Sequence, residues 1–331
     1  MKKRFLYIIA VGIFLSAVIT SCNKEKDVNP GTIQMTTNTP GEVRFTLFGT
    51  GSATIDWGDG TAKETKTIFL YEDNSPTTFS HNFSGTNTRT IRIYGEKFTI
   101  MYCHSNRLTT LDVSNNTELE GLWCGWNQLT NLDVSGATAL KWLSCEGNQL
   151  TTLNVSQNIA LTSFRCSSNQ LTTLNVSNNT ELEELLCGGN RLTSLDVSGA
   201  TALINLDCYY NQLTTLDVSN NTALCQFICG MNQLTNLDIS RNTTLRWLQC
   251  QFNQLTNLHV SSNNTALVYI NCIFNDFTAA TLDALFSALP DNTDSEIKNY
   301  ISIYDNPGTK DCDPSIATDK GWRVETIYTI E

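Results

Sequence analysis

The feature that most constrains this chain is the even spacing of its cysteines. Nine of the 12 cysteines follow one another at intervals of 21 residues, except for an interval of 22 before the last. They are Cys103, Cys124, Cys145, Cys166, Cys187, Cys208, Cys229, Cys250 and Cys272. An asparagine stands three residues after each of them, from Asn106 to Asn275. A fixed period of this length predicts stacked coils, one for each repeat, around a shared core.

Each repeat has the spacing of a short strand followed by a turn. The unit that begins at Leu119 has the order L-x-x-L-x-C-x-x-N-x-L. Alternate side chains of a strand face opposite sides, so we expect Leu122 and Cys124 in the core and Trp123 outside. The order resembles the leucine-rich-repeat frame L-x-x-L-x-L-x-x-N-x-L, with cysteine at the third leucine. Stacking nine such units would give a parallel sheet about 38 Å long.

The other side of each coil is expected to lack helices. About eleven residues of each unit remain for the path back to the next strand, too few for a helix with two turns. We therefore expect a mostly β fold in which this return path is extended or turn-like. Two equally thin sides would make the solenoid nearly straight.

The cysteine column has two interpretations, one chemical and one structural. Nine thiols in a row suggest metal or redox chemistry. Cysteine, however, is among the most buried residue types. In-register neighbours would hold their Cβ atoms about 4.8 Å apart, beyond the 3.5–4.5 Å that disulfides prefer, and no zinc-type ligand set is interleaved. A buried, reduced column is favoured, so no metal site and no cofactor are predicted. Cys225 and Cys312 stand outside the column, and the sequence leaves their redox state open.

A second column, on the return path, is acidic. It consists of Asp112, Asp133, Asp196, Asp217 and Asp238, with Asn154, Asn175 and His259 at the same position of other repeats. Calcium-binding β-rolls are dense in glycine and aspartate, whereas this column has one acid per turn. Solvated turn residues are therefore favoured over calcium ligands.

The first 22 residues have the form of an export signal. Lys2, Lys3 and Arg4 precede an apolar run from Phe5 to Ile19, which is too short for a transmembrane helix. Small residues then stand directly before Cys22, an order that resembles a bacterial lipobox. That resemblance implies lipidation of Cys22, a signal peptide over 1–21 and a tether over 22–31. A plain signal peptide with a chance cysteine is the alternative.

Residues 32–97 contain short alternating runs divided by turn signals, which predicts a small β-sandwich. The run Trp57-Gly58-Asp59-Gly60-Thr61 resembles the signature of PKD-like domains, which are immunoglobulin-like sandwiches. We expect Trp57 in the core. Asp56 and Asp59 are expected to cap backbone amides of the turn rather than to form a catalytic pair.

After the solenoid, predicted over 98–275, residues 276–331 are expected to form an α/β cap over its exposed apolar end. The segment 279–289 has helical spacing, 300–304 and 322–328 indicate strands, and 313–320 indicates a short helix. We expect Trp322 to pack into this cap. The layout as a whole resembles surface leucine-rich-repeat lipoproteins of the Bacteroidetes, which are internalin-like or adhesin-like. The resemblance implies an outer-membrane lipoprotein, exposed at the cell surface, with a role in host or matrix binding.

The outward positions of the repeats differ from one repeat to the next, and many are aromatic. The candidate ligand-binding residues are Trp123, Trp126, Trp142, Tyr209, Tyr210, Trp247, Phe252 and Tyr269. Exposed aromatic residues that gather on one face indicate recognition. The alternative is that these rings stiffen the open sheet through contacts between neighbouring strands. Between the two aromatic groups, Ser163, Ser167, Ser168, Gly188 and Gly189 are expected to leave a shallow groove.

These features favour a binding protein over an enzyme. The chain has none of the sequence motifs of hydrolases, phosphate-binding loops or zinc proteases. Its net charge of −11 excludes nucleic acid as a partner, and its membrane contact is expected only through Cys22. The predicted partner is an extracellular protein, with adhesion as the role. Glycan capture and a structural spacer without a ligand are the alternatives.

Overall fold

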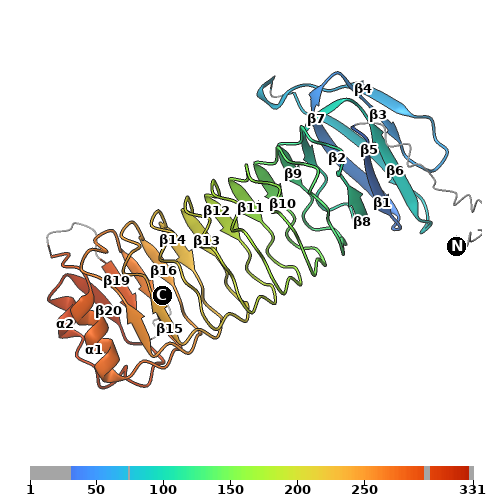
Figure 1. Cartoon of the computed structure of the whole chain (residues 1–331). Helices are drawn as coiled ribbons and strands as arrows, with labels where there is room; N and C mark the ends of the chain where they lie inside the picture. The colour runs from blue at the N-terminus through green and yellow to red at the C-terminus, as the bar shows by residue number, and fades with distance from the viewer. Residues whose placement is uncertain (1–30, 74, 294–298, 328–331) are drawn as a thin grey trace, which may run out of the picture.

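The computed structural model describes residues 31–73, 75–293 and 299–327. A straight stack of coils lies between an N-terminal β-module and a C-terminal segment with two helices (Figure 1). The predicted signal peptide over 1–21, Cys22 and the tether as far as residue 30 lie outside the described residues. Within the described ranges, no helix combines the length and the hydrophobicity that a bilayer span requires.

The N-terminal module consists of short strands whose residues are alternately buried. They are β1 (Ile33–Thr37), β2 (Gly41–Thr50), β3 (Ser52–Asp56), β4 (Glu64–Thr67), β5 (Thr77–Phe83), β6 (Arg89–Tyr94) and β7 (Lys97–Tyr102), with the 3-10 helix η1 (Tyr71–Asp73) between β4 and β5. One antiparallel sheet has the order β4-β3-β6-β1, and the other joins β5, β2 and β7. Apolar side chains fill the space between the sheets, and Trp57 is buried there against Phe45.

Both sheets of this module continue into the solenoid. Strand β7 pairs in parallel with β9 (Gly121–Trp123), and β1 pairs with β8 (Leu108–Asp112) on the other side of the first coil. The Asn106 amide nitrogen donates to the Arg44 carbonyl at 2.8 Å, and its oxygen accepts from the Arg44 amide at 2.7 Å. Strand β2 therefore occupies the place of a preceding coil. The domain boundary predicted at residue 97 falls at the first residue of a strand shared by both parts.

The front of the solenoid is a parallel, in-register sheet of three-residue strands. After β9 these are β10 (Trp142–Ser144), β11 (Ser163–Arg165), β12 (Glu184–Leu186), β13 (Asn205–Asp207), β14 (Gln226–Ile228), β16 (Trp247–Gln249) and β18 (Tyr269–Asn271). The central residue of each strand pairs with the central residue of the next, as Leu122 does with Leu143. This residue points inward and is buried, as the leucine spacing predicted.

The return side contains no helix between residues 98 and 275, as predicted. It consists of turns, with a two-stranded piece of sheet made by β15 (Asn236–Asp238) and β17 (Asn257–His259). Because neither side carries a thick layer, the solenoid is nearly straight (Figure 1).

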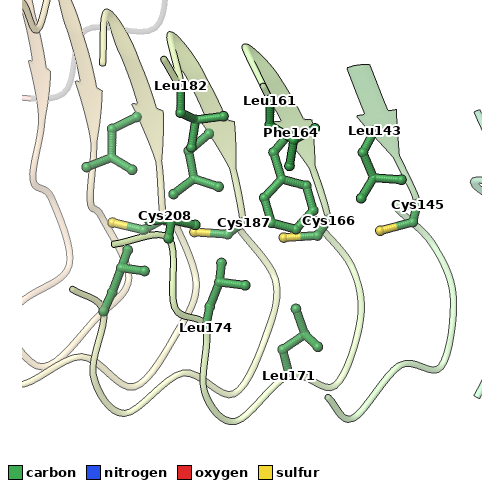
Figure 2. Packing of buried hydrophobic residues seen from close by; sticks show 14 of the residues in the cluster. Leu143, Cys145, Leu161, Phe164, Cys166, Leu171, Leu174, Leu182, Cys187 and Cys208 are labelled. Atoms are coloured by element: carbon green, nitrogen blue, oxygen red, sulfur yellow. The ribbon is translucent and has the colours of Figure 1, made fainter. Parts of the chain in front are cut away.

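Two ladders hold the coils together, one apolar and one polar. The nine cysteine side chains are buried in the core. Figure 2 shows four of them, from Cys145 to Cys208, in a row beneath the strands and among leucines. Beside them the asparagines bond the backbone of two coils at once. The Asn190 amide nitrogen donates to the carbonyls of Cys187 and Cys166, and its oxygen accepts from the Leu171 amide at 3.0 Å. These bonds satisfy backbone groups that would otherwise be buried without partners.

A second asparagine ladder, which the sequence analysis missed, follows the return side. Its members are Asn116, Asn158, Asn179, Asn221, Asn242 and Asn264, with Ala137 and Ala200 in the same column. The Asn158 amide nitrogen donates to the carbonyls of Val134 and Ala137 in the coil before. The same 21-residue spacing would have revealed this ladder. Alanine stands at its position in the repeat that begins at Leu119, from which the pattern was drawn.

The sheet does not stop at residue 275, where the solenoid was predicted to end. After α1 (Ala279–Ala288), the strands β19 (Asn299–Ser302) and β20 (Trp322–Glu325) extend it in parallel, with α2 (Ser315–Thr318) between them. Ile303 takes the place of a cysteine, and Asn306 bonds the Cys272 and Ile303 carbonyls as a further rung of the asparagine ladder. Trp322 is buried in this segment, as expected, and donates to the Pro290 carbonyl at 3.0 Å.

Candidate functional site

The eight candidate aromatic residues occupy two different surfaces. Trp123, Trp142, Trp247 and Tyr269 belong to the strands and point outward from the sheet. Trp126, Tyr210 and Phe252 were predicted at outward strand positions, but the strands end before them. Each lies in the turn that follows, with a φ of 55°. Tyr209 stands between the two surfaces, and its ring centroid lies 6.5 Å from that of Tyr210.

The strand aromatics of the first coils are packed against one another. The Trp123 ring stacks on Tyr102 with 4.5 Å between centroids, and Trp142 follows at 6.4 Å. The indole of Trp123 also covers Gly121, where a Cβ atom would lie 2.5 Å from the ring. Contacts of this kind between neighbouring strands are the stiffening role that was the alternative to binding. The stiffening role therefore applies to these strand aromatics, and their binding role stays a prediction.

The turn aromatics belong to a row of turn residues, each two positions after a ladder cysteine. We term this row the turn ridge. In the first nine coils these are Ser105, Trp126, Gly147, Ser168, Gly189, Tyr210, Met231, Phe252 and Phe274, and φ lies between 50° and 65° in all of them. This left-handed region is open to glycine and costs other residues about 1–2 kcal/mol. Large side chains nevertheless occupy it in five of the nine coils.

Four of the five large side chains of the turn ridge are also exposed, and Met231 is half-buried. Trp126 and Tyr210 are each 62% exposed, Phe252 39% and Phe274 41%. From Tyr210 to Phe274 four consecutive coils contribute to the ridge, a span of about 14 Å. The Phe252 and Phe274 rings stack at 4.5 Å with an interplanar angle of 10°. Trp126 lies over Gly147, where a Cβ atom would approach its indole to 2.7 Å.

The two aromatic groups are separated by coils with small or charged side chains. On the strands, the Arg165 guanidinium donates to Glu184 at 2.7 Å, and the Ser163 hydroxyl donates to the same carboxylate. A pocket of about 380 Å³ lies at the turn edge and includes Gly189 and Tyr210 among its lining residues. Of the five small residues expected to leave a groove, only Gly189 lines this pocket, so a groove across the strands stays a prediction.

The thiols beneath this face are buried and unpaired. All eleven cysteines among the described residues are free, and the nine of the ladder are fully buried. Burial disfavours the thiolate and raises the pKa of Cys103 and of Cys272 to about 12. A thiol that stays protonated is a poor nucleophile and a poor metal ligand. The ladder therefore acts as part of the core.

The acidic column makes turns. Asp133 accepts a hydrogen bond from the Ser135 amide at 2.9 Å, and Asp196 accepts from Ser198 in the same way. Hydrogen bonds from the Ser135 and Ser198 side chains, and after them the bonds from the two amides, lower the pKa of both carboxyls. Within the described ranges, no three His, Cys, Asp or Glu side chains converge on a point where a metal ion would fit.

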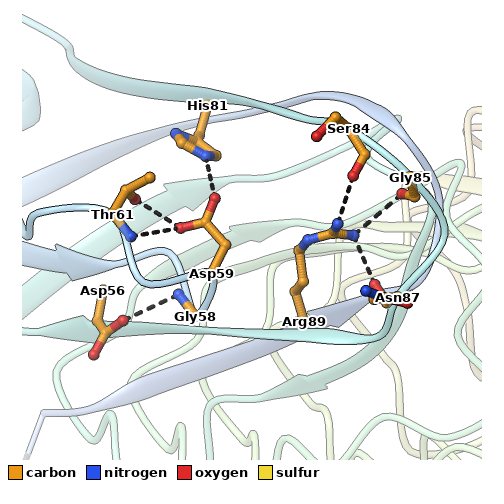
Figure 3. A network of polar contacts seen from close by, with 9 residues as sticks. All are labelled: Asp56, Gly58, Asp59, Thr61, His81, Ser84, Gly85, Asn87 and Arg89. Carbon is orange, nitrogen blue, oxygen red and sulfur yellow. Dashed lines mark hydrogen bonds and ion pairs between the residues drawn. The ribbon is translucent and has the colours of Figure 1, made fainter.

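The two aspartates of the N-terminal module also cap backbone amides, as expected (Figure 3). Asp56 accepts from the Gly58 amide at 3.0 Å, and Asp59 accepts from the amide and hydroxyl of Thr61. The Thr61 hydroxyl is the main cause that lowers the pKa of Asp59 to about 2. His81, which the sequence analysis did not single out, approaches Asp59 to 2.7 Å and stacks on Trp57.

Comparison with solved structures places the fold. The chain is similar to the functional domain of InlJ from Listeria monocytogenes, which includes a cysteine ladder, with 29% identity and a TM-score of 0.53. It is also similar to an internalin, InlF, from Listeria monocytogenes, with 21% identity and a TM-score of 0.56. The matches cover 74% and 66% of this chain, and 56% and 65% of those two chains. No protein-family model and no curated protein matches the sequence. The fold is a mostly β leucine-rich-repeat solenoid.

Proposed function

We propose that this protein binds an extracellular protein through the turn ridge and the adjoining strand aromatics, in an adhesion role at the cell surface. The leucine-rich-repeat fold and its likeness to internalins support a role in protein interaction. In this proposal Cys22 carries the lipid anchor in the outer membrane of a Bacteroidetes cell. The N-terminal module is a PKD-like sandwich, and the segment after residue 275 is the cap.

The observation that carries the proposal is the presence of Trp126, Tyr210 and Phe252 in left-handed turns. Their backbone conformation is strained, and their side chains are exposed to water. Neither property stabilises the chain. Gly147 and Gly189 show that the same turn forms with glycine. Large aromatic residues in such a place are therefore explained by contact with a partner, since Trp and Tyr dominate binding hot spots.

The test combines these three positions in one variant. Trp126→Gly, Tyr210→Gly and Phe252→Gly together are expected to abolish binding to any partner found on an array of host extracellular proteins. A matched variant with Ile159→Gly and Ile204→Gly removes exposed apolar residues outside the ridge and should bind normally.

Equal binding by both variants would refute the ridge as the contact surface. A hit on a parallel glycan array that needs the same three residues would replace the protein partner with a glycan. Silence on both arrays would favour a spacer without a ligand.

The anchor has a separate test. A Cys22→Ser variant cannot be acylated at this position, so it is expected to move from the membrane fraction to the soluble fraction, because acyl chains hold a lipoprotein to the bilayer. Fractionation followed by immunoblotting measures the change. Unchanged retention of the variant would contradict lipidation at Cys22.

A further inference from the structure

A cleft lies where the N-terminal module meets the first coils. Residues 68–73, which include η1, extend from the module beside the start of the solenoid sheet (Figure 1). It contributes Leu70, Tyr71 and Glu72 to a cleft of about 170 Å³. The first three coils contribute Thr99, Ile100, Glu120 and Trp142. Two parts of the chain that are distant in sequence therefore build one concave site.

Two aromatic side chains line this cleft, and both are supported from behind. Tyr71 is 57% exposed and packs edge-on against Phe48, with 5.2 Å between ring centroids. Phe48 in turn contacts Tyr102, which begins the stack that runs through Trp123 to Trp142. Trp142 is 37% exposed at the end of this stack. The rings thus offer accessible surface on a fixed support.

The charge of the cleft is negative. At one end, Glu120 accepts from the Lys141 ammonium at 2.9 Å, and that ammonium lies 6.0 Å from the centroid of the Trp142 ring. The carboxylate and the indole therefore already hold one cation of the chain itself. Glu72 is exposed, and it forms no ion pair among the residues that the structure describes. Asp73 follows it directly.

We propose that this cleft receives an arginine side chain of the protein partner, an inference that rests on the protein-binding function proposed above. A guanidinium stacks on aromatic faces and bonds a carboxylate with two parallel N–H groups. Tyr71 and Trp142 supply the faces, and Glu72 supplies the carboxylate. Arginine fits better than lysine, because a planar fork uses ring and carboxylate together. A neutral sugar would leave the charge of Glu72 uncompensated.

The experiment titrates ¹⁵N-labelled protein with the peptide acetyl-Gly-Ser-Arg-Ser-Gly-amide. The same peptide with citrulline in place of arginine is the neutral control. The indole N–H signal of Trp142, assigned with a Trp142→Phe variant, is expected to shift with the arginine peptide alone. Glu72→Gln should weaken the peptide about tenfold, as should Tyr71→Ala. Glu118→Gln, which removes an exposed carboxylate elsewhere, should leave binding unchanged.

Equal shifts with arginine and citrulline, or no shift of Trp142 at millimolar peptide, would overturn the proposal. So would a glycan that binds the wild type and is lost in Tyr71→Ala while the arginine peptide has no effect. Failure of the ridge proposal gives a different result. In that case the three-glycine ridge variant would still bind the partner. If instead Glu72→Gln binds the partner as well as the wild type does, only the proposal of an arginine in the cleft is refuted.

Discussion

The inner and outer sides of each coil in this solenoid follow different constraints. Cys124 and Trp123 are neighbours in sequence, but the first belongs to a column that is the same in nine coils and the second to a column that changes at every coil. The inward side is constrained by volume and by backbone bonds, which repeat every 21 residues. The outward side has no such requirement, so we expect its residues to reflect the function of this surface. Three experiments test this difference between the inward and outward sides.

The largest effect is expected from alkaline pH, which acts on the whole inward column. Unfolded thiols lose their protons near pH 8.5–9, whereas burial holds the pKa of the ladder thiols far higher, at about 12 for Cys103. The unfolded state then binds fewer protons than the folded state, so stability is retained below about pH 9 and falls as the pH rises. Nine thiols at about 1.4 kcal/mol each give a loss of about 12 kcal/mol per pH unit.

We therefore expect cooperative unfolding between about pH 9 and 11, because a domain is stable by only about 5–15 kcal/mol. Far-UV circular dichroism under reducing conditions measures the transition. A Cys187→Ala variant should unfold with a shallower dependence on pH. Stability that stays constant through pH 11 would mean that the ladder thiols are accessible to water.

A smaller but local loss is expected from the asparagine ladder. Asn190→Ala leaves the Leu171 amide without its partner in the core. It also removes one hydrogen bond each from the Cys166 and Cys187 carbonyls, which keep those from the Asn169 and Asn211 amides. The expected cost is about 2–6 kcal/mol, because the unpaired amide costs about 1–3 kcal/mol and each of the two lost hydrogen bonds contributes about 0.5–1.5 kcal/mol. Urea unfolding measures it, with Asn178→Ala on the exposed side as the control. A cost below about 1 kcal/mol would show that neighbouring coils relax to satisfy these groups.

The smallest effect on stability is expected on the turn ridge. Trp126→Gly relieves a left-handed backbone but gives up the contact over Gly147 and adds flexibility to the unfolded chain. These changes nearly cancel, so the free energy of unfolding should change by about 1 kcal/mol or less. The same urea titration measures it. A large decrease in the free energy of unfolding would mean that Trp126 stabilises the fold. It would also remove the main support for the ridge as a binding surface.

The spacing of Cys103 to Cys272 was enough to predict the solenoid, its parallel sheet and its helix-free return side. It did not reveal the coil around Asn306, because α1 and the segment after it displace that asparagine from the 21-residue period. The strand alternation wrongly predicted Trp126 on the sheet, because no sequence signal indicates that each strand ends after three residues. The cleft beneath Tyr71 has no periodic signal at all. It depends on where a loop of one part meets the sheet of another.

The two ends of the asparagine ladder have a consequence for how this protein changes length. Asn106 bonds β2, and Asn306 bonds the last cysteine-bearing coil, through the same groups that each internal asparagine uses. A duplicated or deleted unit of 21 residues would thus meet compatible neighbours at both joints. Each gene duplication of this kind would lengthen the ridge by about 4.8 Å and leave the termini unaltered. The ladder makes the number of coils a quantity that recombination can vary in whole steps.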